Sequence, residues 1–335
     1  MADKGRKKKF PRWAKIVIAV FIILWVIFLV GYSWVMLKLN KINKAESSQT
    51  VGKDQEYFET NEDEQSYSEM DPDAVQWASD MDIMKDKDVV NILLIGQDRR
   101  PGETRARSDS MIIATINKKT KSIRLTSLMR DLYVQIPGYS DNRINAAYAF
   151  GGMELLDETI EKNFAVHIDG NIEVDFDGFT EVINIIDGVD IDLYQAEADH
   201  LNGQNSSWNL KAGVNHLNGE QALAYARIRY VGNSDYERTD RQRRVLMEVF
   251  NKMKSISISE MLELSDTIFP LLTTDLSNTD LIGYGVSILK MGGSEIETYR
   301  IPGDGAYTPA SIRGMSVLVP DLEKNRELLH SYIFD

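Results

Sequence analysis

Arginine is concentrated in one short segment of an otherwise acidic chain. The eighteen residues RIRYVGNSDYERTDRQRR, numbered 227–244, contain six arginines and no lysine, whereas the whole chain has a net charge of −13. A guanidinium presents a planar fork of donors that binds phosphate or carboxylate oxygens two at a time, whereas lysine acts as a point charge. The segment therefore predicts a site for a phosphate or a carboxylate. The alternative is that these arginines pair on the surface with Asp235, Glu237 and Asp240 and with the acidic residues of segment 38–88.

Two further segments place charged residues directly after apolar runs. Asp98 follows VVNILLIGQ, and Asp109 lies two residues after Arg107, while Arg130 and Asp131 follow SIRLTSLM. Ligands of open α/β sheets bind at the carboxyl ends of strands, so we expect these segments to converge. Asp98 and Asp109 are candidate ligands for Mg²⁺, which prefers hard oxygen ligands beside phosphates. Otherwise these acids cap strand ends or pair with arginine.

The helix that follows the arginine-rich segment has two possible starts. Both SDYE, from Ser234, and TDRQ, from Thr239, fit the capping-box pattern. Either start places Arg238 or Arg241 near the helix N-terminus, where the macrodipole disfavours a cation. A bound anion would relieve this conflict.

The apolar pattern predicts the elements that position these side chains. We expect strands at 89–98, 111–116, 122–128, 172–176, 188–193, 297–301 and 316–319. We expect helices at 145–164, interrupted at Gly151–Gly152, and at 179–186, 219–229, 245–253, 280–291 and from Asp321 onward. Arg227 and Arg229 can point into one site only if the helix over 219–229 ends before them. Strands and helices mix without strict alternation, which predicts a single three-layer αβα sandwich with a mixed central sheet.

The N-terminal residues predict a membrane anchor. Residues 1–15 carry a net charge of +6, and residues 16–37 contain no charged side chain. That stretch is long enough to cross a bilayer, and its bulky end favours an uncleaved helix over a cleaved signal peptide. The positive-inside rule places residues 1–15 in the cytoplasm and the rest outside the cell, although a buried core helix is the alternative. Residues 38–88 then form an acidic extracellular stalk, with a short helix near 74–78, and residues 89–335 form the folded domain.

The sequence argues against several classes of function. The chain has no cysteine, which excludes disulfides and cysteine-ligated metals, and its four histidines lack metal-ligand spacing. P-loop, GxSxG and HExxH motifs are absent from the sequence. The chain after residue 15 carries −19, so we expect no nucleic-acid partner.

Six ordered motifs resemble those of the LytR-CpsA-Psr family of Gram-positive cell-envelope proteins. They are NILLIGQD, RSDS, SLMRDLYVQIPG, RINAAYAFGG, GVNHLNGEQALAYARIRY and SDYERTDRQRRVL, within residues 89–254. The resemblance implies a magnesium-dependent phosphotransferase that acts outside the membrane. Such enzymes move an anionic glycopolymer, such as wall teichoic acid or capsule, from a polyprenyl-diphosphate carrier to a muramic-acid hydroxyl of peptidoglycan, forming a phosphodiester.

The resemblance also implies roles for individual residues. Asp109 matches the family's magnesium-binding aspartate, and Asp98 matches the acid near it. The positions that match pyrophosphate-binding residues are Arg107, Arg130, Arg227, Arg229, Asp235, Arg238 and Gln242. Arg130 and Arg227 are also candidate catalytic residues, and Asp98 or Asp131 is the candidate base. Met129 stands where many members have proline, which alters a backbone restraint but leaves the pair Arg130–Asp131 intact.

Two other functions remain open from the sequence. A polyprenyl-diphosphate pyrophosphatase would use the same site with water as the acceptor. A non-catalytic protein that binds wall polymer, or a transcriptional attenuator, is the other alternative. The predicted cytoplasmic part, residues 1–15, is too short for a DNA-reading module.

Overall fold

We describe the fold from a computed structural model of the chain. It describes residues 29–45, 50, 52, 57–58, 67–99, 105–229, 231, 235–291 and 296–335. The chain divides into two compact units, Met1–Lys41 and Ile42–Asp335. In the first unit, residues 29–39 are helical. No helix among the described residues is long and apolar enough to cross a membrane, and most of the predicted span 16–37 lies outside the described residues.

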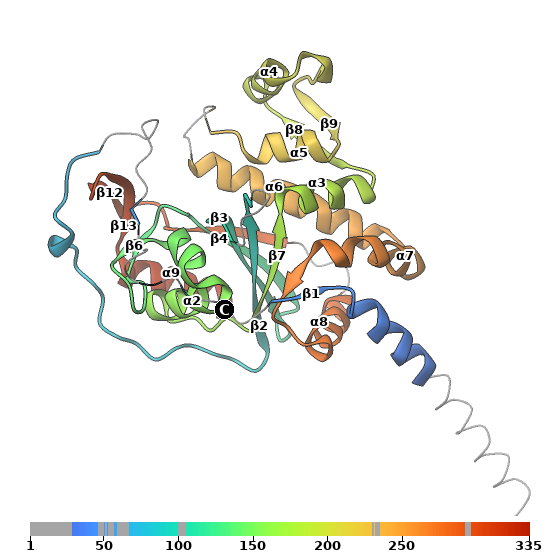
Figure 1. The fold of residues 1–335 in the computed structure, drawn as a ribbon, viewed down its shortest axis with the longest axis horizontal. Coiled ribbons are helices and arrows are strands. Elements are labelled where there is room, and N and C mark those ends of the chain that lie inside the picture. The colour runs from blue at the N-terminus through green and yellow to red at the C-terminus, as the bar shows by residue number, and fades with distance from the viewer. Residues whose placement is uncertain are drawn as a thin grey trace, which may run out of the picture. The chain divides into compact units, whose positions relative to one another are not determined.

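The second unit is built on a central sheet of seven strands (Figure 1). The strands are β1 (Asn43–Lys44), β2 (Val89–Gln97), β3 (Ser108–Asn117), β4 (Ser122–Leu128), β7 (Gly170–Asp175), β10 (Thr273–Thr274) and β11 (Ile296–Ile301). Their spatial order is β1-β10-β7-β2-β3-β4-β11. Strands β2, β4, β7 and β11 run in one direction, whereas β3 and β10 run in the opposite direction. The sheet is therefore mixed, and the carboxyl ends of β2, β4 and β7 share one edge with the start of β3.

Helices and smaller strands complete the unit. The helices are α2 (Ile144–Phe164), α3 (Phe176–Ile185), α4 (Gln195–Gln204), α5 (Gly219–Ala226), α6 (Asp235–Ser255), α7 (Ile258–Ile268), α8 (Asn278–Met291) and α9 (Leu322–Phe334). The 3-10 turns are η2 (Pro72–Ala74), η3 (Ser206–Trp208) and η4 (Phe269–Leu271). Antiparallel pairs join β5 (Tyr133–Val134) to β6 (Asn142–Arg143), β8 (Val189–Leu193) to β9 (Gly213–Leu217), and β12 (Tyr307–Ile312) to β13 (Met315–Pro320).

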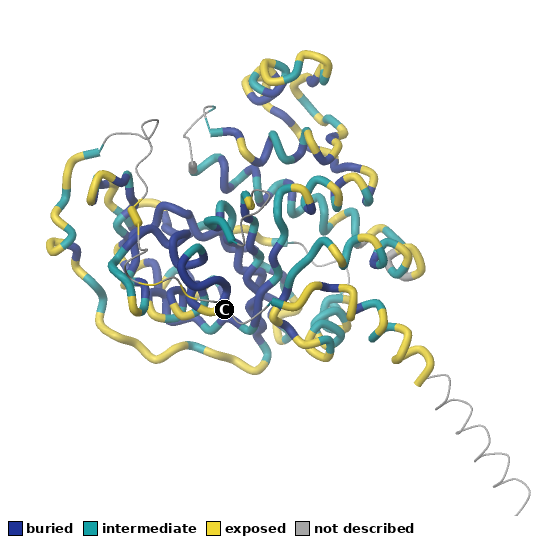
Figure 2. The backbone as a smooth tube through the Cα atoms, in the orientation of Figure 1, coloured by how far each residue is buried: buried dark blue, intermediate teal, exposed yellow. Residues whose placement is uncertain are grey.

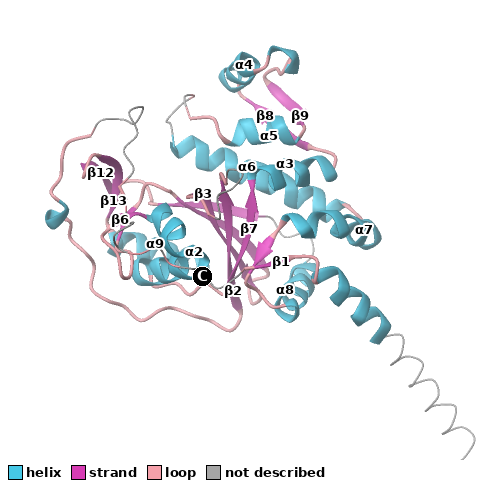
Figure 3. Cartoon of the chain, viewed as in Figure 1, coloured by secondary structure: helices cyan, strands magenta, loops and turns pink. Residues whose placement is uncertain are grey.

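Helices cover both faces of the central sheet, as the sequence predicts (Figure 3). Alternate residues of β2 point to opposite faces. Leu93 and Ile95 pack in the core that includes residues of α2 and α9, whereas Ile92 packs in a core with residues of α8. On the α8 side, α6 covers Ile112 of β3 and Leu125 of β4. The three layers of the predicted αβα sandwich are present, and β2 is buried on both faces (Figure 2).

Most predicted elements form with small shifts at their ends. The predicted interruption of α2 is confirmed, because Gly152 has φ 66° and ψ −151° inside the helix. The predicted unit of strand, helix and strand over 172–193 forms as β7, α3 and β8. Strand β8 does not join the central sheet but pairs with β9. Its residues alternate between buried and exposed, which suits a two-stranded sheet with one covered face.

Part of the predicted stalk lies against the domain. Val75 is buried, and the Trp77 ring stacks on Tyr133 with 5.9 Å between ring centroids. Glu69 forms a β-bridge with Ser311 of β12. The short helix predicted near 74–78 is instead the 3-10 turn η2. The few apolar residues of this acidic segment therefore hold it to the folded unit over part of its length.

A carboxyl group on α2 is expected to make stability depend on pH. The Asn171 side-chain amide donates hydrogen bonds of 2.7 Å to Asp157 Oδ2 and to Asp275 Oδ2. Burial, opposed by the hydrogen bond from Asn171 and reinforced by the nearby charges of Asp275, Glu161 and Glu154, raises the pKa of Asp157 to about 8. The folded state thus binds a proton more tightly than the unfolded chain, whose aspartates have a pKa of about 4. The free energy of unfolding should fall as pH rises from about 4 to about 8.

Asp157→Asn should remove this penalty. We expect the variant to melt at a higher temperature than wild type at pH 8, by roughly 2–4 °C for each kcal/mol recovered. At pH 4 the two proteins should melt at nearly the same temperature, because Asp157 is then protonated in the folded state. Thermal unfolding across this pH range measures the difference. An equal difference at both ends of the range would contradict the assignment.

Candidate active site

One edge of the central sheet gathers the predicted acids and arginines. Asp98 follows β2, Asp109 is the second residue of β3, and Arg130 lies two residues after β4. Arg130 Nη1 donates to Asp109 Oδ1 at 3.1 Å. Arg227 Nη2 lies 3.4 Å from Asp98 Oδ2. The convergence expected from the sequence is therefore present at the carboxyl ends of the strands.

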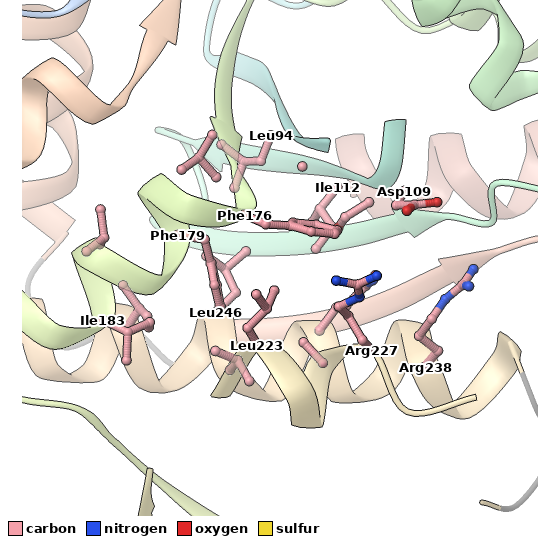
Figure 4. A pocket seen from close by; sticks show the side chains of 18 of the residues that line it. Leu94, Asp109, Ile112, Phe176, Phe179, Ile183, Leu223, Arg227, Arg238 and Leu246 are labelled. Atoms are coloured by element: carbon pink, nitrogen blue, oxygen red, sulfur yellow. The ribbon is translucent and has the colours of Figure 1, made fainter. Parts of the chain in front are cut away.

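A cavity of about 560 Å³ lies between this sheet and helices α3, α5 and α6. Its polar lining includes Asp109, Arg227, Arg229, Arg238 and Gln242. Its apolar lining includes Leu94, Ile112, Phe176, Phe179, Ile183, Leu223 and Leu246. Figure 4 shows Asp109, Arg227 and Arg238 together at one end, with Phe179, Ile183 and Leu246 away from them. The cavity can thus accept a molecule that has a charged head and a long apolar body.

Helix α6 explains this division of the cavity. Arg238, Gln242, Val245 and Val249 all line it, and their spacing of four, three and four residues puts them on one helical face. The face is polar in the first turns and apolar afterwards. The helix begins at Asp235, so Thr239 lies inside it and is not its N-cap. The side chain of Asp235, a predicted pyrophosphate ligand, lies outside the described part of the structure.

Arg238 therefore lies at the helix start, where the sequence predicts that an anion binds. It is the fourth residue of α6, and it is buried with 4% of its surface exposed. A positive side chain in this position opposes the helix macrodipole unless an anion lies beside it. Phosphate at the polar end of the cavity would supply that anion.

Arg227 and Arg229 reach the same cavity because α5 ends before them. Arg227 is the C-cap residue of α5, and both arginines line the cavity. The Arg227 guanidinium lies 4.7 Å from the ring centroid of Phe176, the first residue of α3. The sequence does not predict a role for Phe176. A cation over an aromatic ring is a recurring contact, and no local pattern relates these two residues.

The other arginines of the segment have structural partners. Arg241 Nε donates to Glu197 Oε1 at 2.7 Å, and both side chains are 2% exposed. Arg243 and Arg244 pair with Asp240. The prediction that Arg241 could serve an anion at the helix start was wrong, because this side chain turns to Glu197 of α4. Ion pairs with acidic residues, buried or on the surface, therefore account for three of the six arginines in this segment.

Arg241 also fixes the backbone that carries two cavity arginines. Its guanidinium donates to the carbonyl oxygen of Ile228 at 3.2 Å and to that of Val231 at 2.9 Å. Ile228 stands between Arg227 and Arg229. These contacts indicate that Arg241 positions the loop after α5 without touching the cavity.

Arg241→Met is expected to lower the free energy of unfolding by about 3–5 kcal/mol, because it leaves Glu197 buried without its cationic partner. Adding Glu197→Gln should restore much of that stability, since a neutral amide leaves no unpaired buried charge and its one oxygen can still accept the hydrogen bond from the Tyr194 backbone N–H. The rate of the transfer reaction that the family resemblance implies should stay low in the double variant, because the carbonyls of Ile228 and Val231 still lack their donor. Chemical denaturation and the kcat and KM for transfer measure the two effects. Recovery of the rate together with stability would show that Arg241 has no positioning role.

Two predicted site residues contact partners outside the cavity. Arg107 Nη1 lies 3.5 Å from Asn145 Oδ1, and the Arg107 guanidinium lies 4.7 Å from the Tyr57 ring centroid. Asp131 Oδ1 lies 3.4 Å from Arg130 Nε and 3.6 Å from Arg143 Nε. Like Asp98 and Arg130 at the sheet edge, neither Arg107 nor Asp131 is among the described residues that line the cavity.

The geometry separates the two candidate bases. The Asp131 side chain is 11% exposed and lies between two arginines, whereas the Asp98 side chain is 40% exposed. A base must reach the proton of an incoming hydroxyl. Asp98 is therefore the better candidate, and Asp131 is better suited to hold Arg130 in place.

A buried polar network joins the ends of β2 and β7 to α2. The Gln97 side-chain amide and the Tyr148 hydroxyl both donate to the carboxylate of Glu173, and Gln97 Oε1 accepts from the backbone N–H of Ala106 at 3.1 Å. Burial, reinforced by the adjacent Glu173 charge, raises the pKa of Tyr148 well above its usual range, so its hydroxyl remains a donor. The network joins the ends of β2 and β7 to the segment before Asp109. No local sequence pattern predicts this network, because its members lie on separate elements.

The acidic side chains at this edge of the sheet suit a metal ion that also binds an anionic ligand. Among the described residues, no group of three or more His, Asp or Glu side chains could hold a metal ion. Asp109, whose side chain is 25% exposed, lines the cavity, and Asp98 lies at the same edge of the sheet. Mg²⁺ is usually bound through one or two carboxylates and the phosphates of its substrate. The donor set is therefore chemically suited to a magnesium ion that binds with a diphosphate.

Comparison with known proteins agrees with this arrangement. The model of the LytR_cpsA_psr family matches residues 41–331. TagV and TagT of Bacillus subtilis strain 168, both named polyisoprenyl-teichoic acid–peptidoglycan teichoic acid transferases, are 32% identical over 252 residues and 29% identical over 316 residues. These matches cover 72% of this chain and 64% of TagV, and 92% of this chain and 91% of TagT. A structure of TagT with bound octaprenyl pyrophosphate lipid superimposes with a TM-score of 0.58 and 25% identity, over 87% of this chain and 99% of that one.

Proposed function

Because the chain belongs to the LytR_cpsA_psr family, we propose that it is a phosphotransferase that moves an anionic glycopolymer from a polyprenyl-diphosphate carrier to peptidoglycan. One observation carries the proposal. A single cavity joins a cluster of arginines and an aspartate to a long apolar lining. A polyprenyl diphosphate has the same division between its headgroup and its chain. The names of TagT and TagV, and the lipid bound in the TagT structure, support this class of substrate.

The two ends of the cavity would bind the two parts of the carrier. Arg227, Arg229 and Arg238 would hold the diphosphate oxygens, with Gln242 as a neutral donor beside them. The prenyl chain would lie along the apolar side chains of α3, α5 and α6. Burial of each methylene contributes about 0.8 kcal/mol, so the chain supplies most of the affinity and the arginines fix the position of the phosphorus atoms.

The reaction is an in-line substitution at phosphorus. A muramic-acid hydroxyl of peptidoglycan attacks the phosphorus that bears the glycopolymer, and its proton passes to Asp98. The bond from this phosphorus to the bridging oxygen breaks, so polyprenyl monophosphate leaves and a phosphodiester joins the glycopolymer to peptidoglycan. Arginines already placed at the diphosphate stabilise the charge that develops in the transition state.

The remaining charged residues prepare this site. Arg130 is held by Asp109 at 3.1 Å and by Asp131 at 3.4 Å, which fixes its guanidinium at the sheet edge. Asp109 would hold Mg²⁺ together with the diphosphate oxygens, which leaves Asp98 as the base, and the ion would supply further neutralisation of the diphosphate when bound. Arg107 would join the diphosphate only after leaving its contacts with Tyr57 and Asn145.

The proposed place of this reaction is the outer face of the cell membrane. Residues 16–37 would span the bilayer, residues 1–15 would remain in the cytoplasm, and the domain that carries the cavity would lie outside. The charge asymmetry of residues 1–37 supports this orientation. The partners would be the lipid bilayer, the polyprenyl-linked glycopolymer and peptidoglycan.

The test uses the full chain, a synthetic polyprenyl-diphosphate oligosaccharide and a soluble peptidoglycan oligomer. With Mg²⁺ and acceptor, we expect polyprenyl monophosphate and a phosphate-linked adduct in equal amounts, both detected by mass spectrometry. Omission of the acceptor should stop the release of polyprenyl monophosphate. Equal release without acceptor would favour a pyrophosphatase. Tight binding of the carrier without any bond cleavage would favour a wall-polymer-binding protein.

A further inference from the structure

Helix α8 has an apolar face that the described part of its folded unit leaves partly exposed. Its inner side chains, Leu281 and Ile288 among them, pack against the sheet. On the other side, Val286 is 42% exposed and Leu289 is 59% exposed. Ile282, which is half-buried, precedes them by four and seven residues, so the three side chains form one stripe along the helix.

The stripe itself is uncharged, and the space beside it is open. All residues of α8 are described, and of its two charged side chains Asp280 lies on another face of the helix, whereas Lys290, four residues after Val286, lies at the edge of the stripe. A Cβ atom added at Gly285, which is next to Val286, would have no heavy atom within 4 Å. A soluble helix normally presents polar side chains to water on its outer face, so a second apolar face indicates a partner.

The chain connects α8 closely to the predicted membrane span. Five residues separate Leu37, where that span ends, from Asn43, where β1 begins. Because each residue of an extended chain spans at most about 3.6 Å, this connection keeps β1 within roughly 22 Å of the bilayer. Asn43 pairs with Thr273 of β10, and Lys44 Nζ donates to the carbonyl oxygen of Leu276 at 2.7 Å. Helix α8 begins two residues after Leu276.

We propose that Ile282, Val286 and Leu289 dock the domain on the outer leaflet of a phospholipid bilayer. This inference rests on the membrane anchor of the proposed function and goes beyond it, because an anchor alone leaves the domain free to rotate. Three side chains provide only a weak contact, but the short connection raises its effective concentration, so a weak contact is sufficient. The docked helix sets the orientation of the cavity relative to the membrane that supplies the lipid carrier.

The chain contains no cysteine, which allows a single label at any position. Val286→Cys in the full chain, labelled with a small environment-sensitive fluorophore, is reconstituted in phospholipid vesicles whose acyl chains are brominated. Val214→Cys is the matched control, because Val214 of β9 is also a valine and is 74% exposed. We expect several-fold stronger quenching by brominated lipid at position 286 than at position 214.

Each outcome has a distinct meaning. Equal, weak quenching at both positions in protein that floats with the vesicles would overturn the docking inference and leave the anchor in place. Protein that fails to float would overturn the anchor together with this inference. The transfer reaction with soluble acceptor would still test the proposed function separately.

A second pair of variants tests the consequence for turnover. Val286→Asp combined with Leu289→Asp should slow transfer from vesicle-embedded carrier several-fold, and should leave transfer from a short, water-soluble carrier unchanged. Val214→Asp should change neither rate. An equal loss with both carriers would show damage to the domain and would contradict a specific role at the bilayer.

Discussion

Replacement of Asp109 by asparagine is expected to lower the kcat for transfer by about 10²–10³-fold, the loss usually seen when one preorganised electrostatic group is removed from an active site. The change keeps the shape of the side chain and removes its charge. Asp109 is the acid that lines the cavity and accepts a hydrogen bond from Arg130 at 3.1 Å. The rate that remains should no longer respond to Mg²⁺ in the millimolar range. Steady-state transfer kinetics at several Mg²⁺ concentrations measure both effects.

A matched control separates this effect from a general loss of negative charge. Asp190 lies on β8, where it contacts His216 on an exposed surface, and Asp190→Asn should leave kcat and the Mg²⁺ response unchanged. Carrier binding by Asp109→Asn, measured without acceptor, should remain detectable, because the apolar lining is intact. Wild-type kcat with wild-type Mg²⁺ dependence in Asp109→Asn would remove Asp109 from the site.

Replacement of Leu223 by tryptophan is expected to remove most of the affinity for long carriers. Leu223 lines the cavity one helical turn before Arg227, so an indole there would fill the space next to the arginines. The KM for a carrier of eight isoprene units should rise by about 10²-fold or more, given the free energy that each buried methylene contributes. A carrier of two units should be affected much less, because little of it extends beyond Leu223.

The control for this variant lies on the same helix. Glu220 of α5 is exposed, so Glu220→Trp adds the same side chain without entering the cavity. It should preserve the preference for the long carrier. Retention of that preference by Leu223→Trp as well would mean that the prenyl chain binds elsewhere.

The main elements of the fold follow from local patterns. Continuous apolar runs predict strands buried on both faces, such as β2, and a spacing of three and four predicts the face of α6 that includes Val245 and Val249. Strands β1 and β10 have two residues each, which is too short for any pattern to emerge. The separate pairing of β8 with β9 was also missed, because periodicity shows that a strand exists and does not specify its partner.

In the candidate site, too, the neighbouring sequence predicts some residues, whereas other roles depend on contacts between residues that are far apart in the chain. The strand-end positions of Asp98 and Asp109 could be predicted because each follows or begins an apolar run. The role of Arg241 could not, because it depends on Glu197, which lies 44 residues earlier in the chain. The contact of Phe176 with Arg227 likewise joins two helices through the fold. Sequence reasoning therefore identified the charged groups and did not separate those that line the cavity from those that support it.

The most direct test of the proposed transfer is to run the reaction in water enriched in ¹⁸O and to weigh each phosphate-containing product. Attack by a peptidoglycan hydroxyl places no solvent oxygen on phosphorus, so the adduct and the polyprenyl monophosphate should both have their unlabelled masses. Labelled oxygen in a released glycopolymer phosphate, with acceptor present in excess, would show that water is the acceptor and would contradict transfer to peptidoglycan.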